Sequence, residues 1–357
     1  MINDKKNRRQ FIREMTTLGA GVTLTGALTG CATFDDYLFD DKNDLDDEIV
    51  IIGGGISGLY AAHLFRSKSI EFRLYEASPY FGGRIKSIGS RDYGANLLSQ
   101  RDELVTKLVD EFKLEKIFID RDSYYLESGM QAVVDGLKER VLGLLPYRHF
   151  RMRWKLIEIQ KLTEGYELTF QKPEGQKKVR CKKLLLTLPP PQLLSIKGIA
   201  DLPETKTFAE KISQTRTEYA IRLILPVSSI ANTTKNFQNF EFPNFNVRQL
   251  IKKNKGSATV ELDVLFNSNV NASIDFIYQE LKKKLQINYP FSKLSGEQFY
   301  YWGKNSVSGG AFFHLNENIE YSPSDPILFV GDSFGGQPSA RIEAALQSVK
   351  NALKTIV

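Results

Sequence analysis

The sequence is poor in the residues that build metal centres and nucleophilic active sites. It has three histidines and two cysteines, Cys31 and Cys181, among 357 residues. They form no Ser-His-Asp set, no Cys-His pair and no cluster with the spacing of metal ligands. We therefore predict no metal site. Cys181 lies in a strand-like run, where a free cysteine packs as a small apolar side chain.

The chain also lacks a strong excess of charge of one sign. Its formal net charge is +6, and residues 1–30, with five basic and two acidic side chains, account for half of it. The remaining charge is too small to indicate a nucleic-acid partner. The length leaves room for two domains around a sizeable core.

The N-terminal region contains no apolar run long enough to cross a bilayer as a helix, which takes about 20 residues. Its uncharged stretch, residues 15–30, follows a basic stretch that contains Arg8 and Arg9 and resembles a twin-arginine export signal. Residues 28–31, which end in Cys31, resemble a lipoprotein box, in which the cysteine sulfur carries the lipid. These resemblances predict an exported, periplasmic lipoprotein anchored to a membrane, with the outer membrane favoured. The alternative is an ordinary apolar helix with a chance cysteine.

A short acidic segment follows the predicted export signal. Residues 35–48 contain eight carboxylates and one lysine. Such a composition is typical of a solvated tether, and the alternative is that the segment only precedes the first strand. We predict an export signal over residues 1–30 and an acidic tether over residues 31–47.

A strand, a glycine-rich turn and a helix come next. The apolar run 48–52 leads into Gly53, Gly55 and Gly58, followed by a helical pattern over 59–65. In a dinucleotide site the first glycine permits the tight turn, the second lets the pyrophosphate approach the backbone, and the third lets helix and strand pack closely.

Two further features complete this pattern. Ile56 and Ser57 lie at the start of the helix, where free N–H groups bind phosphate. A second strand, residues 72–76, ends in Glu76, 18 residues after Gly58. A carboxylate near this spacing bonds a ribose diol. The sequence therefore predicts dinucleotide binding.

The residues after Glu76 resemble the flavin-containing amine oxidase superfamily. Its members have a Gly-Gly-Arg segment here, matched by Gly83 and Arg84 and the residues beside them. The resemblance implies non-covalent FAD, with the arginine contacting its phosphates. Further matching segments are 92–95, 127–137, 184–189 and the hairpin 156–170.

The same resemblance assigns further contacts to the cofactor. It places the backbone amide of Leu156 at the adenine, Trp302 beside the flavin, and the amide of Ile342 at flavin O2. Gly331 and Asp332 stand where the superfamily has Gly-Glu, so Asp332 has a shorter reach toward a hydroxyl of FAD.

The predicted catalytic region departs from the superfamily. Arg222 stands where many members have a lysine, and Phe312 and Arg341 stand where amine oxidases have an aromatic cage. Ala311 replaces the cysteine that binds flavin covalently in some members. The two arginines could be paired with protein carboxylates or with a carboxylate on the substrate, and both could be structural. Lys252 and neighbouring lysines are expected on a solvated face.

These observations predict an α/β protein with a Rossmann-like FAD-binding domain and a second, mixed α+β substrate domain. The FAD-binding domain is expected over 48–98, 126–192 and 299–357, and the substrate domain over 99–125 and 193–298. The resemblance implies an FAD-dependent oxidoreductase that oxidises an amine or amino-acid-like small molecule by hydride transfer to flavin N5, with oxygen or a quinone as electron acceptor. The alternatives are an enzyme that resembles desaturases or protoporphyrinogen oxidases and acts on a large apolar substrate, and a flavin-binding protein without catalysis.

Overall fold

The structure is a computed structural model. It describes residues 46–143, 150–230, 235–254, 257–267, 274–294, 298–303, 306, 308–315, 325–335 and 341–356. The predicted export signal, the lipidation site Cys31 and all of the tether except residues 46 and 47 lie outside the described residues. None of the described helices is long and apolar enough to cross a membrane.

The first sheet is built on the predicted glycine-turn motif. Its parallel part has the order β8-β2-β1-β11-β18. The N-terminal part of β11 pairs antiparallel with β10, and β10 pairs antiparallel with β9. The apolar run of β1 is buried on both faces, as in other parallel sheets covered on both sides. The strands are β1 (Asp46–Ile52), β2 (Arg73–Glu76), β8 (Phe150–Met152), β9 (Lys155–Lys161), β10 (Tyr166–Lys172), β11 (Gly175–Leu186) and β18 (Ile327–Phe329).

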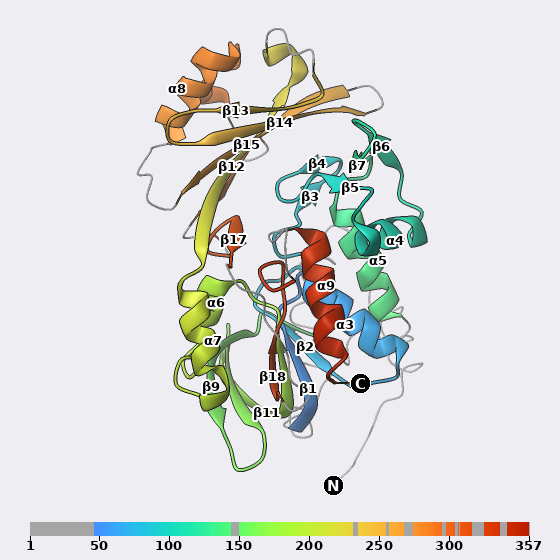
Figure 1. Ribbon diagram of the computed structural model, residues 1–357, viewed down its shortest axis with the longest axis vertical. Helices are drawn as coiled ribbons and strands as arrows, with labels where there is room; N and C mark the ends of the chain where they lie inside the picture. Colours follow the sequence, from blue (N-terminus) through green and yellow to red (C-terminus); the bar gives the residue numbers. More distant parts are fainter. Residues whose placement is uncertain are drawn as a thin grey trace, which may run out of the picture. The chain divides into compact units, whose positions relative to one another are not determined.

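Helices cover one face of this sheet. Helix α3 (Ile56–Ser67) connects β1 to β2 and packs against α5 (Gln131–Leu142) and α9 (Ile342–Leu353) (Figure 1). Helix α4 (Glu103–Glu111) contacts α9. Apolar side chains from these helices and from β1 and β2 form one continuous buried cluster, which fixes α3 directly after the glycine turn.

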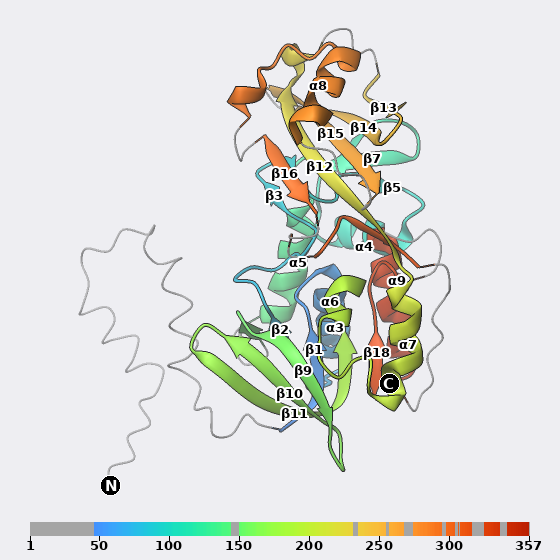
Figure 2. The same cartoon turned by 90° about the vertical axis from the view of Figure 1, so that its left-hand side faces the viewer.

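The opposite face carries α6 (Pro190–Leu194) and α7 (Pro203–Ser213). Leu193, Ala209 and Ile212 from this region are buried in a cluster with side chains of β9, β10 and β11. Free Cys181 is buried in the same cluster, as expected for a small packing residue. Figure 2 shows the β9–β10 hairpin extending from the parallel strands.

The second sheet is antiparallel, with the order β13-β14-β15-β12-β16, and β17 also pairs with β12. Helix α8 (Ile274–Leu285) packs its apolar side chains on one face, so the other face is free to present polar side chains (Figure 2). The strands are β12 (Arg216–Pro226), β13 (Phe237–Glu241), β14 (Asn246–Asn254), β15 (Ser257–Asn267), β16 (Phe299–Trp302) and β17 (Phe312–His314).

Small strands lie between β2 and β8 in the chain order, and two short 3-10 turns lie among the strands of the second sheet. They are β3 (Ser87–Ile88), β4 (Arg91–Asp92), β5 (Leu98–Ser99), β6 (Lys116–Phe118), β7 (Ser123–Leu126) and two short 3-10 turns, Val227–Ser229 and Phe291–Lys293. Strands β3 and β4 pair as a hairpin, and β7 pairs with both β5 and β6.

The predicted fold class is confirmed, since a Rossmann-like mixed sheet is joined to an antiparallel-sheet domain. The two sheets divide the chain differently from the predicted ranges at two places. Residues 193–213 pack on the first sheet through α6 and α7, although they were assigned to the substrate domain. Strands β16 and β17 pair with β12 in the second sheet, although they were assigned to the FAD-binding domain.

Candidate functional site

One cavity of about 530 Å³ runs from the carboxyl ends of β1 and β2 to the antiparallel sheet. Its walls contain all but one of the predicted cofactor and catalytic residues. The exception is Gly58, which lies beneath the turn. The predicted residues that line it are Gly53, Gly55, Ile56, Ser57, Glu76, Gly83, Arg84, Leu156, Arg222, Trp302, Phe312, Gly331, Asp332, Arg341 and Ile342.

The three motif glycines meet different constraints. Gly53 has a φ of +109°, and a Cβ there would lie 2.4 Å from Thr187 Oγ1. A Cβ on Gly58 would lie 1.9 Å from the Gly53 carbonyl oxygen. Gly55 has an ordinary φ of −71°, and a Cβ there would meet no protein atom within 4 Å. The protein itself therefore requires glycine at positions 53 and 58, whereas Gly55 faces open cavity.

The start of α3 is suited to an anion. Gly55 is the N-cap, no side chain caps the helix, and its first turn contains no acidic residue. N–H groups in the first turn of a helix lack intrahelical acceptors and favour phosphate. Ile56 and Ser57, in this turn, line the cavity.

Glu76 is fixed beside this turn at the end of β2. Its Oε2 accepts a hydrogen bond from Gly54 N at 2.5 Å, and its Oε1 accepts one from Ser78 N at 2.7 Å. The residue is only 9% exposed. These backbone donors orient the carboxylate at the cavity wall and leave each oxygen a further lone pair for a hydroxyl group.

Arg84 and Asp332 form an ion pair across the cavity wall. Arg84 Nη1 lies 2.8 Å from Asp332 Oδ2, and Nη2 also donates to Oδ1. Nη1 donates in addition to the Ala311 carbonyl at 3.0 Å, and the guanidinium lies over the Phe313 ring. The pair joins the segment after β2 to the segment after β18, two places that the sequence assigned separately to the cofactor.

Arg341 precedes α9 and has a carboxylate partner in the protein. Its Nη2 lies 2.8 Å from Asp102 Oδ2. In the first turn of α9, Glu343 accepts hydrogen bonds from Leu104 N and Val105 N, at the start of α4. The two contacts join α9 to α4 and place Ile342 at the cavity wall.

The end of the cavity at the antiparallel sheet combines aromatic and charged side chains. Trp302 is buried and donates from Nε1 to the Tyr93 carbonyl at 2.5 Å. Phe312 lies beneath the guanidinium of Arg248, 5.3 Å from its Cζ to the ring centroid. Ala311, the position of the covalent cysteine in some flavoproteins of the resembled superfamily, also lines this end.

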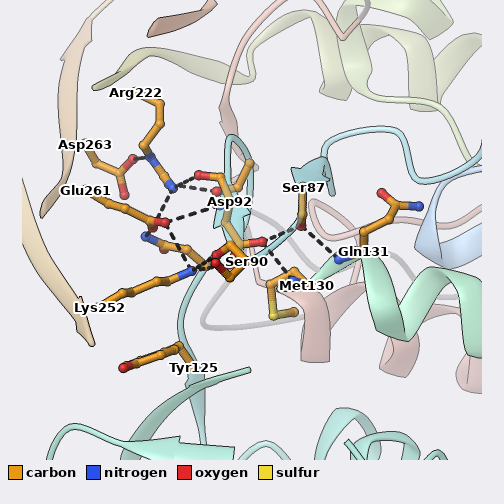
Figure 3. Close-up of polar contacts among 12 residues, drawn as sticks. Ser87, Ser90, Asp92, Tyr125, Met130, Gln131, Arg222, Lys252, Glu261 and Asp263 are labelled. Atoms are coloured by element: carbon orange, nitrogen blue, oxygen red, sulfur yellow. Dashed lines mark hydrogen bonds and ion pairs between the residues drawn. The ribbon is translucent and has the colours of Figure 1, made fainter. Parts of the chain in front are cut away.

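A buried charge network lies on the sheet face beside this end (Figure 3). Arg222 Nε donates to Asp263 Oδ1, and Arg222 Nη1 lies 3.1 Å from Glu261 Oε2. Lys252 Nζ lies 3.1 Å from Glu261 Oε1 and also pairs with Asp92 Oδ2. We call these five residues the charge network. Each is at most 6% exposed.

The charge network joins the antiparallel sheet to the loop beside the cavity. Arg222 donates to the carbonyls of Asp92 and Gly94, the latter from Nη2 at 2.7 Å. Asp92 Oδ1 accepts from Met130 N at 2.8 Å, at the start of α5. Asn96 Nδ2 donates to Glu261 at 2.8 Å. Residues 92–96 are thus held by both domains.

The two cations of the charge network stay charged, whereas burial raises the pKa of Glu261 and outweighs the lowering by the charges of Lys252 and Arg222. Burial lowers the pKa of Lys252, but the charges of Glu261 and Asp92 outweigh that effect and raise it. Burial likewise lowers the pKa of Arg222, and Asp263 and Glu261 together raise it. Both cations therefore stay protonated, and removing one of them would leave buried carboxylates uncompensated.

The structure corrects one sequence prediction at this site and provides carboxylate partners for two predicted arginines. Lys252 was expected on a solvated face, which is wrong, because it is 1% exposed and paired with two carboxylates. Arg222 and Arg341 both have protein carboxylate partners, which is one of the two alternatives that the sequence left open.

Sequence reasoning missed Glu261 and Asp263, although the alternation of polar and apolar residues along β15 was a usable signal. Arg248, at the cavity wall, was also missed.

Comparisons with known proteins agree with this geometry. Residues 51–112 match a family described as an NAD(P)-binding Rossmann-like domain. The chain is 29% identical over 126 residues to an L-amino-acid oxidase from Sistrurus catenatus edwardsii, and 30% identical over 81 residues to mitochondrial protoporphyrinogen oxidase from Nicotiana tabacum. These matches cover 32% and 22% of this chain and 24% and 16% of those proteins.

Solved structures extend the similarity to the fold of most of the chain. A variant of putrescine oxidase aligns with a TM-score of 0.65 at 12% identity, covering 87% of this chain and 99% of that one. Cyclohexylamine oxidase from Brevibacterium oxydans aligns with a TM-score of 0.62 at 13% identity, covering 87% of this chain and 98% of that one. The chain therefore has a flavin amine oxidase-like fold with a Rossmann-like domain, and distant similarity to amine, amino-acid and protoporphyrinogen oxidases.

Proposed function

We propose that this protein is an FAD-dependent oxidoreductase that oxidises an amine or amino-acid-like molecule. The observation that carries the proposal is the continuous cavity. At one end, a strand–turn–helix motif presents uncapped helix N–H groups and a glycine that faces open space. At the other end lie Trp302, Phe312 and a set of charged side chains. The first end would hold a dinucleotide cofactor, and the second end would bind the substrate.

The residues present fit FAD. Gly55 leaves room where a pyrophosphate approaches the backbone, and the start of α3 offers donors to it. Glu76 is oriented to accept hydrogen bonds from the ribose hydroxyls. Leu156 and Ile342 also line the cavity, and their backbone amides would contact the adenine and the flavin. FAD, when bound, supplies the redox chemistry.

The chain's own residues position the reacting groups and set the electrostatics. Trp302 and Phe312 provide apolar walls at the end nearest the antiparallel sheet. The charge network holds the 92–96 loop against the same end of the cavity through hydrogen bonds from Arg222 and to Glu261. The ion pair between Lys252 and Asp92 adds a further contact to this loop. The dipole of α9 favours negative charge near its start, where Ile342 lies.

A second candidate function is oxidation of a larger, apolar substrate. The sequence similarity to a protoporphyrinogen oxidase favours it. Arg248 in the cavity wall favours the first proposal, because an apolar substrate would offer no acceptor to its guanidinium, which lies beyond hydrogen-bonding distance of Asp263. A flavoprotein without catalysis is a third possibility that the same experiment tests.

Anaerobic mixing of purified holoprotein with panels of amines and amino acids tests the proposal. We expect at least one of them to bleach the flavin absorption bands rapidly, because substrate oxidation transfers two electrons to the flavin. Bleaching by an apolar tetrapyrrole or polyene alone would support the second candidate. If dithionite reduces the flavin but no compound in any panel does, this result would contradict an enzymatic function.

We further propose that the chain is exported and lipid-anchored, supported by Arg8, Arg9 and Cys31 in the order that such signals require. Replacing both arginines by lysine should leave the precursor in the cytoplasm. Cys31→Ser should yield protein that incorporates no labelled fatty acid. Normal export of the double-lysine variant would refute the twin-arginine route, and labelling of the serine variant would refute lipidation at Cys31.

A further inference from the structure

Four arginines line the cavity, and three of them are engaged by protein carboxylates within hydrogen-bonding distance. Arg84 pairs with Asp332, Arg341 with Asp102 at 2.8 Å, and Arg222 with Asp263 and Glu261. Arg222 also donates to two backbone carbonyls. A guanidinium has five N–H donors. Arg222 is therefore largely occupied by the protein.

Arg248 differs from these three. It lies on β14 opposite Asp263 of β15, and its Nη2 is 3.6 Å from Asp263 Oδ2, beyond hydrogen-bonding distance. Its Nε is buried and has no hydrogen-bond partner within the part of the chain that the structure describes. Its side chain is 39% exposed. This guanidinium therefore has donors that no described protein group uses.

The surroundings of Arg248 orient it for recognition. The guanidinium lies over the Phe312 ring, with its Cζ 5.3 Å from the ring centroid, and makes a cation–π contact with it. Asp263, the nearest carboxylate, already accepts from Arg222 through Oδ1. A guanidinium held on an aromatic ring presents a planar fork that matches the two oxygens of a carboxylate.

We propose that Arg248 is the specificity-determining residue that binds an anionic group, a carboxylate in the first instance, on the substrate. This inference rests on the proposed function and deepens it, because it assigns a substrate class to the end of the cavity beside Phe312. Arg222 and Arg341 act in this account as positioning residues, paired within the protein. The binding step involves no bond cleavage and no proton transfer.

Benzoate and its neutral amide analogue, benzamide, test this role. Isothermal titration calorimetry on the purified full-length protein measures their dissociation constants whether or not flavin is present, and flavin content is measured separately. We expect wild-type protein to bind benzoate more tightly than benzamide. Losing a charged hydrogen-bond partner should weaken benzoate binding in Arg248→Met by about 10- to 150-fold, with benzamide binding unchanged. Arg248→Lys should fall between the two, since it keeps the charge and loses the fork.

The matched control is Arg216→Met, on β12 of the same sheet. Arg216 does not line the cavity, and its side chain is 64% exposed. Its Nη2 lies 3.5 Å from Glu218 Oε1. This variant should bind benzoate like wild-type protein. Equal benzoate affinity in Arg248→Met and wild type, or no preference of wild type for benzoate over benzamide, would overturn the proposal. If the protein contains no flavin and FAD cannot reconstitute it, but Arg248→Met still loses the preference for benzoate, the Arg248 proposal is upheld and the FAD proposal is refuted.

Discussion

Gly55→Val should fold like the wild-type chain and lose its FAD. A Cβ at position 55 meets no protein atom within 4 Å and the position has an ordinary φ, so the apoprotein should lose only the modest advantage that glycine has over valine at a helix N-cap. The added methyl groups occupy the space where the cofactor approaches the backbone. Overpacking typically costs about 1–3 kcal/mol, which corresponds to about 5- to 150-fold in affinity. FAD titration of apoprotein, with thermal unfolding of the same samples, measures both effects.

The neighbouring glycine provides the contrast. In Gly58→Ala the new Cβ would lie 1.9 Å from the Gly53 carbonyl oxygen, so the turn itself must move. We expect this variant to unfold at lower temperature even without cofactor. An unaltered FAD affinity in Gly55→Val would show that the cofactor does not approach the turn there, and the assignment of this end of the cavity would be wrong.

Lys252→Met should lower the free energy of unfolding by about 3–5 kcal/mol, the usual cost of removing one partner from a buried ion pair. The lysine is 1% exposed and contacts Asp92 and Glu261, both of which are also buried. Without it the charge network contains three carboxylates and one cation. Chemical denaturation followed by far-ultraviolet circular dichroism measures the change.

Lys253 supplies the matched control, because it is adjacent in the same strand and exposed. Lys253→Met should change the free energy of unfolding by no more than about 0.5 kcal/mol. Adding Glu261→Gln to Lys252→Met should restore part of the loss, since it removes one of the uncompensated charges. If Lys252→Met and Lys253→Met have the same stability, the charge network does not contribute as described.

The dinucleotide half could be predicted because its signals are local. The apolar run of β1, the glycine turn, α3 and Glu76 fall within about 30 residues, the usual extent of a βαβ unit, and each constrains the next. The hairpin β9–β10 was also placed correctly. In these segments, residues that are close in the sequence are also close in space, so their spacing along the chain predicts their relative positions.

The charge network could not be predicted because it depends on strand register. Lys252 stands in a lysine-rich segment that reads as a solvated surface, and only the pairing of β14 with β15 brings it to Glu261. Its other partner, Asp92, lies 160 residues away. Arg222 was singled out as a departure from a family pattern, but the cross-strand pairing with Asp263 became visible only in the structure.

The pairing of Arg341 required long-range information as well. Its partner Asp102 stands at the start of α4, 239 residues earlier, and the contact depends on how α4 packs against α9. A single sequence gives no measure of that packing. Arg248 could not be predicted for the same reason, because its proposed role in binding an anionic group depends on its contact with Phe312 from another strand.

The most direct test of the central claim is the absorption spectrum of the purified full chain, followed by acid precipitation. We predict flavin bands in the native spectrum and FAD, identified by chromatography, in the supernatant after precipitation. Colourless protein that FAD cannot reconstitute would contradict the assignment of the cavity, and flavin retained in the pellet would contradict non-covalent binding.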